Sequence, residues 1–302
     1  MDREQEEMQF LGLFGIYKEA CKIMYSWRRL LGQISLVLIL PLSVIFLVHM
    51  EVSDLLFSNK IVDIGIVLDD TQAKSRTYNI VSNVPSSELT TFWLFEAANF
   101  PILLIFSIPS TSAVVYTIAC IYTGREVDFK KAMSVVPKVW KRLMATFLCY
   151  YLFLFVYNIL AIVILFIWIP GFGSTKAFFP ILIVFIIVFF VGFVYMTIVW
   201  QLVSVVTVLE DTYGFGAMIK SKALTQRKMR VAALVFSRLN TLFTIILVLF
   251  MNLVVMNSLS LGVVSRVGFG VLCLLLHFVL YLFGHVVQTL LYFVCKSYRL
   301  PL

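Results

Sequence analysis

Five polar side chains near the carboxyl end of the sequence share one face of a predicted helix. They are His277, Tyr281, His285, Gln288 and Tyr292, and they recur at steps of three or four residues. Histidines in such a row can carry protons, because their ordinary pKa lies near neutrality. The same row can instead form hydrogen bonds between helices of a membrane bundle. We favour the second interpretation, and two histidines without a third ligand are a weak indication of a metal site.

Other polar residues also fall inside apolar segments, where an ionisable or amide side chain is costly in lipid. The candidates for a polar cavity are Asn158, Gln201, His277, His285 and Gln288. A cavity lined by them would offer a path for a solute. The competing interpretation is again hydrogen bonding between helices, which we prefer.

The elements that position these residues are apolar segments long enough to cross a hydrocarbon layer of about 30 Å. The 302-residue chain is 61% hydrophobic and 13% charged. Its six apolar segments are residues 31–48, 101–122, 143–169, 178–209, 231–257 and 267–295. Pro101 suits the first position of the second segment. We therefore predict an all-α, polytopic helical bundle that forms a single integral membrane domain over residues 1–302, with one long polar loop at 49–91.

Three basic stretches precede apolar segments, and each has the period of an amphipathic helix. They are residues 10–29, 124–142 and 210–230. Such helices lie in the membrane interface, where basic side chains attract anionic headgroups. We expect three interfacial helices on the cytosolic side, although the first could simply pack on the bundle. The candidate headgroup-binding residues are Lys130, Lys131, Lys138 and Lys141.

Lysine and arginine are distributed unequally between the two sides of the predicted bundle. Nineteen of the 24 lie before the first segment, in the other two basic stretches, after the sixth segment or, for Arg238, near the start of the fifth segment. The positive-inside rule places these regions, and both termini, in the cytosol. Loop 49–91 is then extracytosolic. The endoplasmic reticulum and the plasma membrane both fit this topology.

A short motif carries a family resemblance. Residues 209–224 contain an acidic residue at the end of a span, followed by an alanine, a basic–Ser pair and a leucine: Glu210, Ala217, Lys220-Ser221 and Leu224. This stretch resembles the membrane domain of some bacterial glycerophosphodiester phosphodiesterases. The hydropathy of nearly the whole chain resembles an uncharacterised family of plant six-span proteins. The phosphodiesterase catalytic domain has no counterpart here, so the resemblance implies no catalytic residue.

The sequence contains no Ser–His–Asp set, H-E-x-x-H motif or phosphate-binding loop. We therefore predict a non-enzymatic membrane scaffold or accessory protein without a cofactor. Its expected partners are membrane lipids or other membrane proteins, and its oligomeric state is left open. Nucleic acid is excluded as a partner, because the basic residues gather at span ends and no nucleic-acid-binding fold signature occurs. The alternative function is a transporter or channel for a small solute or lipid.

Overall fold

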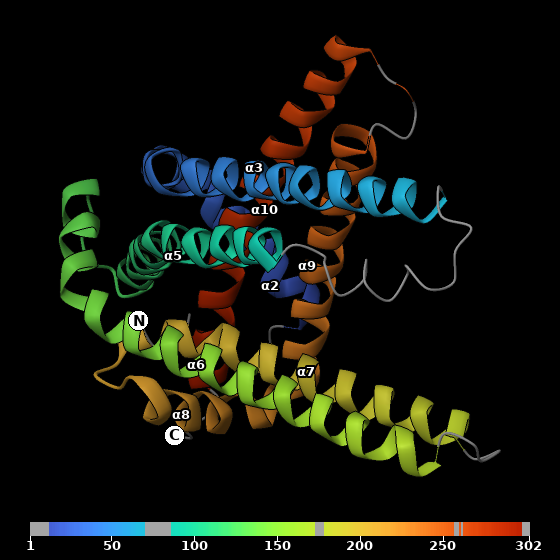
Figure 1. Cartoon of the computed structure of the whole chain (residues 1–302). Coiled ribbons are helices and arrows are strands. Elements are labelled where there is room, and N and C mark those ends of the chain that lie inside the picture. The colour runs from blue at the N-terminus through green and yellow to red at the C-terminus, as the bar shows by residue number, and fades with distance from the viewer. Residues whose placement is uncertain (1–11, 70–85, 173–177, 257–259, 261, 298–302) are drawn as a thin grey trace. The chain divides into compact units, whose positions relative to one another are not determined.

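The structure, a computed structural model, describes residues 12–69, 86–172, 178–256, 260 and 262–297 (Figure 1). The regular secondary structure of these residues is entirely helical, which confirms the all-α class for this part of the chain. The helices are α2 (Leu13–Ser26), α3 (Arg28–Asp69), α5 (Ser86–Tyr122), α6 (Phe129–Phe172), α7 (Phe178–Leu209), α8 (Gly214–Thr225), α9 (Met229–Phe250) and α10 (Val263–Ser297). A 3-10 turn at Gln226–Lys228 precedes α9, and a π-helical turn at Met251–Val255 follows it.

Six helices are long and apolar enough to cross a membrane, as the six apolar segments predict. Their candidate spans are Arg28–Asp54, Ala97–Tyr122, Phe129–Trp168, Pro180–Leu209, Met229–Val255 and Val263–Ser297. The chain is therefore a multi-pass membrane protein by the length and composition of its helices. Most of these helices begin or end beyond the predicted apolar segments.

The polar segment 49–91 is more helical than a loop assignment implies. Helix α3 continues through it to Asp69, and α5 begins at Ser86, while residues 70–85 lie outside the described part. Helix α5 also runs through Pro101, which we expected at a first helical position. A proline inside a membrane helix is tolerated because neighbouring groups satisfy the backbone carbonyl that it leaves without a donor.

The three basic stretches fold in two different ways. The first and third contain the separate helices α2 and α8, whereas the second contains the first turns of α6. No glycine lies between Phe129 and Leu143, and the single proline, Pro137, is accommodated within the helix. The helix therefore continues from the basic stretch into the span, with one backbone hydrogen bond missing because Pro137 has no N–H.

The segment before α6 is set by the way α5 ends. Gly124 has a positive φ of 64°, a conformation that glycine adopts without steric cost. The Arg125 N–H bonds to the Cys120 carbonyl at 3.0 Å, and the Gly124 N–H bonds to the Ile121 carbonyl at 3.3 Å. This pair of bonds is a Schellman motif, which satisfies the last carbonyls of a helix. It turns the chain toward the start of α6.

The chain folds into two compact units. The first unit comprises Met1–Ile34, Ile108–Asn240 and Leu282–Leu302, and the second comprises Ser35–Ser107 and Thr241–Tyr281. Helices α3, α5, α9 and α10 contribute residues to both units.

In the first unit, α6 and α7 lie side by side, and α8 contacts both of them (Figure 1). The paired helices direct large apolar side chains outward: Leu152 is 62% exposed, Phe166 75% and Phe190 63%. An apolar surface of this extent suits lipid tails rather than water.

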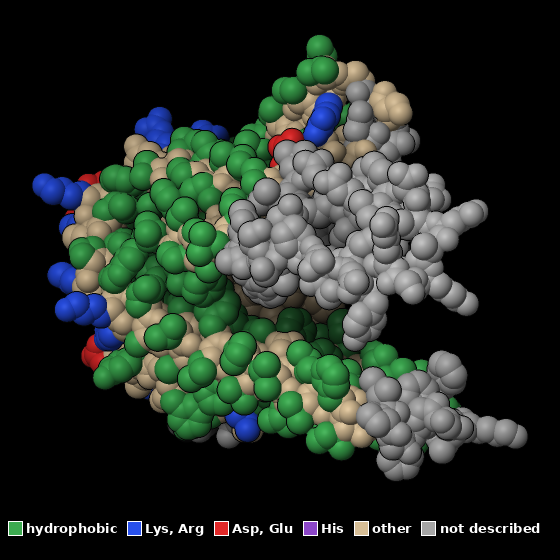
Figure 2. Space-filling model, in the orientation of Figure 1, with side chains coloured by type: hydrophobic (Ala, Val, Ile, Leu, Met, Phe, Trp, Pro, Cys, Tyr) green, Lys and Arg blue, Asp and Glu red, His purple; other side chains and the backbone are tan. Residues whose placement is uncertain are grey.

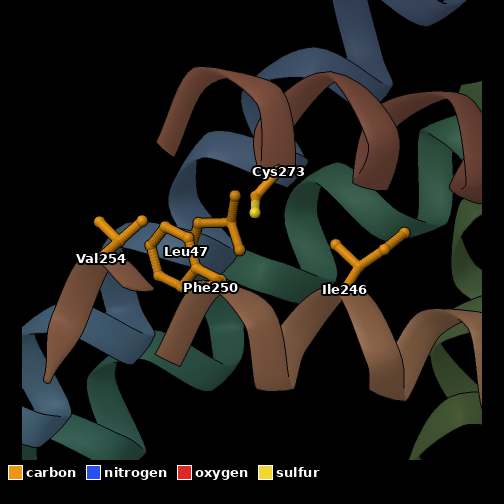
Figure 3. Close-up of a cluster of buried hydrophobic side chains, with 5 residues drawn as sticks. All are labelled: Leu47, Ile246, Phe250, Val254 and Cys273. Atoms are coloured by element: carbon orange, nitrogen blue, oxygen red, sulfur yellow. The ribbon is translucent and has the colours of Figure 1, made fainter. Parts of the chain in front are cut away.

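In the second unit, a cluster of buried side chains joins α3, α9, the π-helical turn and α10. Its members are Leu47, Ile246, Phe250, Val254 and Cys273 (Figure 3). Each is at most 9% exposed. Transfer of apolar surface from water is favourable, and dense packing adds dispersion attraction between the side chains. The cluster therefore holds the four elements of this unit against one another.

Candidate functional site

All five residues of the predicted polar face lie on α10. His277 and Tyr292 are each 1% exposed, Gln288 is 4% and His285 is 9%. The face is divided between the two units, because the boundary on α10 lies between Tyr281 and Leu282. His277 and Tyr281 belong to the second unit, and the other three residues belong to the first.

Gln288 joins α10 to α7 in the first unit. Its side-chain amide Nε2 donates a hydrogen bond of 2.6 Å to Ser204 Oγ and another to the Gln201 carbonyl. Ser204 Oγ in turn donates to the same carbonyl at 3.1 Å. Gln201 therefore takes part through its backbone. Hydrogen bonds of this kind hold membrane helices together.

Glu210, at the end of α7, accepts contacts from three side chains. The Tyr292 hydroxyl donates to its Oε1 at 2.6 Å, and Lys296 Nζ lies 3.3 Å from the same atom. Lys220 on α8 pairs with Oε2. The Glu210 side chain is only 12% exposed. These contacts connect the end of α7 to α8 and to the last turns of α10.

The pKa of Glu210 reflects this environment. Burial by itself raises the pKa of a carboxyl group, because it penalises the charged form. Hydrogen bonds from Lys220 and Tyr292, together with the charge of Lys296, outweigh burial and lower the pKa below its ordinary value of 4.5. Glu210 is therefore held as a carboxylate and acts as an ionic anchor.

Short polar contacts fix α8 on α6 and α7. The Gly214 N–H, at the start of α8, donates to Thr146 Oγ1 at 2.9 Å. Thr146 Oγ1 also lies 3.2 Å from Thr207 Oγ1. At the next turns of α8, Ser221 Oγ donates to the Val199 carbonyl at 2.9 Å. These contacts satisfy polar groups that would otherwise be buried without partners.

In the second unit, His277 lies among aromatic rings. Its ring centroid is 4.9 Å from that of Phe243, 5.3 Å from Phe46 and 6.0 Å from Tyr281. The Nδ1 atom shares a hydrogen bond of 3.0 Å with Ser43 Oγ. Within the described residues, Nε2 is buried without a hydrogen-bond partner. The imidazole is thus packed and oriented like a core side chain.

Asn158 completes the set of predicted cavity residues. It lies on α6, and its amide Nδ2 donates at 2.7 Å to the Leu154 carbonyl one turn earlier in the same helix. Gln288 is therefore joined to the Gln201 backbone, while Asn158 bonds to its own helix and His277 bonds to Ser43 in the second unit.

The four candidate headgroup lysines lie on the first turns of α6. Lys130, Lys131, Lys138 and Lys141 are all exposed. A stripe of apolar residues on the same turns is buried: Ala132, Val136, Val139 and Leu143. Figure 2 shows Lys and Arg side chains gathered at the edge of the molecule where α6 begins. The basic stretch thus presents its lysines outward while its apolar stripe packs inside the first unit.

A second basic feature lies at the junction of α2 and α3. A pocket of about 500 Å³ is lined there by Trp27, Arg28, Arg29 and Gln33, together with Val127 and Asp128 just before α6. Basic side chains of the first stretch therefore lie next to the start of the second. Their separation by about 100 residues in the sequence concealed this relationship.

Helices α2 and α8 each have a buried stripe and an exposed apolar side. On α2, Ile16, Ala20 and Ile23 are buried, while Phe14 is 78% exposed. Phe14 therefore lies on the outer side of α2. On α8, Ala217 and Leu224 are buried, whereas Phe215 and Ile219 are 57% and 55% exposed. Both helices thus keep apolar side chains on the surface beside lysines.

Tyr17 anchors α2 to the first unit. Its hydroxyl donates to the Val235 carbonyl of α9 at 2.9 Å, and its ring lies 5.8 Å from that of Phe283 on α10. Burial raises the pKa of Tyr17, against the opposing charge of Arg238, so the hydroxyl stays protonated. The partner carbonyl lies 218 residues away in the sequence, and helical periodicity gives no indication of it.

Two further ion pairs also connect residues far apart in the chain, and the sequence analysis predicts neither. Arg142 Nη1 lies 2.6 Å from Asp211 Oδ1, and Arg266 Nη2 lies 3.3 Å from Glu51 Oε1. Across the described residues, no group of three or more His, Cys, Asp or Glu side chains is arranged to hold a metal ion.

Comparison with known proteins adds one match. A family model described as a domain of unknown function (DUF8558) matches residues 1–300. No curated protein and no solved structure matches the chain.

Proposed function

The chain belongs to the DUF8558 family, and we propose that it is a non-enzymatic membrane scaffold or accessory protein that binds anionic lipids at its cytosolic face. Both termini lie in the cytosol in this proposal, and the host membrane is the endoplasmic reticulum or the plasma membrane. The strong excess of Lys and Arg on one side of the bundle supports this orientation. Protease digestion of tags at both ends, on sealed vesicles of known orientation, tests it.

The observation that carries the proposal is the arrangement of the first turns of α6. Four lysines are exposed there, while the apolar stripe from Ala132 to Leu143 is buried in the first unit. A helix fixed in this way cannot turn its lysines inward, so they stay available to headgroups. Each basic residue near an anionic surface contributes about 1 kcal/mol of attraction.

The outer sides of α2 and α8 support the same proposal. Phe14 on α2 and Phe215 and Ile219 on α8 are exposed apolar side chains on short helices that also carry exposed lysines, Lys22 and Lys222. Apolar residues next to lysines are typical of helices that lie in a membrane interface. We propose that these side chains enter the acyl boundary of the cytosolic leaflet.

The polar residues within the spans also favour a structural role over transport. Gln288 bonds to Ser204 and the Gln201 backbone, and Asn158 bonds to its own helix. Side chains engaged in this way are occupied in holding helices rather than in contacting a solute. Transport of a small solute or lipid is the alternative function, and these contacts count against it.

The test is a lipid-competition measurement on the full chain. The protein is reconstituted into lipid discs that contain equal amounts of phosphatidylserine and phosphatidylcholine, and the lipids retained after extraction are counted by native mass spectrometry. The variant replaces Lys130, Lys131, Lys138 and Lys141 with Gln. We expect the enrichment of phosphatidylserine to fall by at least about tenfold, since the loss of 1.4 kcal/mol already corresponds to that factor.

The matched control removes four basic charges from the predicted opposite side, by replacing Lys60, Lys74, Arg76 and Lys176 with Gln. This control should keep the enrichment, as should a variant with Arg at the four α6 positions. Equal enrichment in the α6 glutamine variant and the wild type would contradict the proposal.

A structural hypothesis accompanies the family assignment. We propose that the motif at residues 209–224, which resembles the bacterial phosphodiesterase membrane domain, is a folding element. Its residues support this interpretation, because Ala217, Ser221 and Leu224 form the buried face of α8 and Glu210 pairs with Lys220. The relationship to plant six-span proteins also stays a hypothesis.

A further inference from the structure

The second unit contains a groove between α3, the end of α9 and the start of α10. Its volume is about 410 Å³, which lies within the range of small-ligand sites. The lining is mainly apolar and includes Val44, Val48, Val254, Val267 and Gly270. Leu47, Phe250 and Val254, which belong to the buried cluster shown in Figure 3, also line the groove.

Two charged side chains also line this groove, and they pair with each other. Arg266 Nη2 lies 3.3 Å from Glu51 Oε1, and both side chains are partly exposed, at 36% and 39%. Glu51 is the last lining residue of α3, and Arg266 lies in the first turn of α10. The ion pair is therefore close to one end of the groove, with the apolar lining beyond it.

Arg266 is held in place by a second contact. Its Nε donates to the Val254 carbonyl in the π-helical turn that ends α9. A guanidinium group has five N–H donors. Each of the two contacts with described residues uses one N–H donor, so three donors remain for a ligand. A fixed guanidinium with free donors is suited to a phosphate oxygen pair.

The position along the spans indicates where a ligand would lie. Glu51 is three residues beyond the apolar segment 31–48, and Arg266 immediately precedes the apolar segment 267–295. This position suits headgroup contacts for the two charged side chains and acyl-chain contacts for the apolar lining. Exposed Val44, Val48 and Val267 flank the groove, so a chain from the surrounding lipid can enter it.

We propose that this groove binds one glycerophospholipid with a zwitterionic headgroup. One acyl chain lies in the apolar groove, the phosphate contacts Arg266 and the ammonium group contacts Glu51. The charge pattern selects this occupant, because a positive and a negative side chain at one end of an apolar groove complement a headgroup that carries both signs. The site is independent of the α6 lysines, which lie in the first unit and bind anionic lipid.

Two glycines on α10 provide matched variants. Gly270 lines the groove, and a Cβ atom built there lies in ordinary contact with Val254, at 3.8 Å. A larger side chain therefore fits on the backbone and fills the groove. Gly268 is on the same helix but does not line the groove, and a Cβ atom there meets nothing within 4 Å. Gly270→Phe tests the groove, and Gly268→Phe is its control.

The measurement is native mass spectrometry of the full chain, extracted from bilayers that contain equal phosphatidylethanolamine and phosphatidylglycerol. We expect the wild type and Gly268→Phe to retain one phosphatidylethanolamine each. Gly270→Phe should retain about tenfold less of it, because excluding even two methylene groups costs that factor. Thermal unfolding in detergent verifies that both variants are folded.

The headgroup assignment is tested separately with variants of the ion pair. Glu51→Gln removes the partner of the ammonium group, so retention should shift toward phosphatidylglycerol. Arg266→Gln should reduce retention of both lipids.

The proposal is overturned if the wild type holds the two lipids equally, if the two glycine variants retain the same amount of lipid, or if a fatty acid or a peptide occupies the groove. Every protein in this comparison, the reference included, carries Gln at Lys130, Lys131, Lys138 and Lys141, so phosphatidylglycerol retained by the α6 lysines does not enter the counts.

Discussion

The hydroxyl group of Tyr292 donates a hydrogen bond of 2.6 Å to the carboxylate of Glu210, although 82 residues separate them. Lys296, one turn further along α10, lies 3.0 Å from the same hydroxyl oxygen and 3.3 Å from the carboxylate. Lys220 of α8 pairs with the other carboxylate oxygen. Glu210 is therefore the point at which α7, α8 and α10 are joined.

Removing the donor at this point should destabilise the first unit. Tyr292→Phe leaves the buried carboxylate with one hydrogen bond fewer, and we expect the free energy of unfolding to fall by about 1–2 kcal/mol. Glu210→Gln should cost more, because two lysines lose their charged partner. Thermal unfolding in detergent measures both effects. Asp211→Asn is the control, because its fully exposed carboxylate should contribute nothing measurable. An equal loss for Glu210→Gln and Asp211→Asn would show that burial is unimportant here.

The lowered pKa of Glu210 predicts a dependence of stability on pH. The folded protein binds the proton of this carboxyl group less readily than the unfolded chain, whose value is about 4.5. The stabilising contribution is therefore complete above pH 4.5, and it is lost as the pH falls through the lower, folded-state pKa. We expect the melting temperature of the wild type to fall more steeply below pH 4.5 than that of Glu210→Gln. Parallel curves for the two proteins would contradict the assignment.

The local part of this ionic site could be predicted from the sequence, and the distant part could not. Glu210 and Lys220 lie ten residues apart within one polar linker, so their opposite charges indicate a pair. Tyr292 was recognised only as one member of a polar helical face, and Lys296 only as a basic residue near the carboxyl end. Their partner is fixed by how α10 packs beside α7, and no periodicity within α10 carries that information.

The fold shows the same division. Hydropathy predicts six membrane-crossing helices because length and apolar composition determine that property directly. It does not predict where the helices end in polar sequence, as the continuation of α3 to Asp69 and of α5 back to Ser86 shows. Polar side chains are compatible with a helix once it leaves the lipid, so composition alone does not mark its end. The groove at Glu51 and Arg266 likewise depends on packing between segments about 215 residues apart.

The backbone conformation at position 214 should require a glycine, Gly214. It begins α8 with a positive φ of 59°, and its N–H donates to Thr146. A Cβ atom there makes ordinary contact with Cys149 Sγ at 3.5 Å, so space is not limiting. Gly214→Ala should therefore cost about 1–2 kcal/mol for the left-handed backbone alone. Gly216→Ala, two residues later, meets nothing within 4 Å and should stabilise α8 by up to about 1 kcal/mol. Opposite shifts in melting temperature are expected, and shifts of the same sign would contradict this account.

Gly192 and Tyr157 should be energetically coupled across the α6–α7 pair. The Tyr157 hydroxyl donates at 2.7 Å to the Phe189 carbonyl, and a Cβ atom on Gly192 would lie 2.5 Å from that hydroxyl oxygen. Gly192→Ala must displace the phenol and break its hydrogen bond, a loss of about 1 kcal/mol. The better helix propensity of alanine offsets this loss by a similar amount. The single variant should therefore be nearly neutral in thermal unfolding.

In a Tyr157→Phe background the hydroxyl is absent, and only the ring carbon Cζ, 3.3 Å from the added Cβ, must shift slightly. The same Gly192→Ala change should therefore gain up to about 1 kcal/mol of stability from helix propensity. A double-mutant cycle measures this difference, and the coupling free energy should be about 1 kcal/mol. Gly284→Ala on α10 is the control, because a Cβ atom there meets nothing within 4 Å. Its effect should be the same with Tyr or Phe at position 157. If Gly192→Ala also has the same effect in both backgrounds, the close approach of α6 and α7 at this point is wrong.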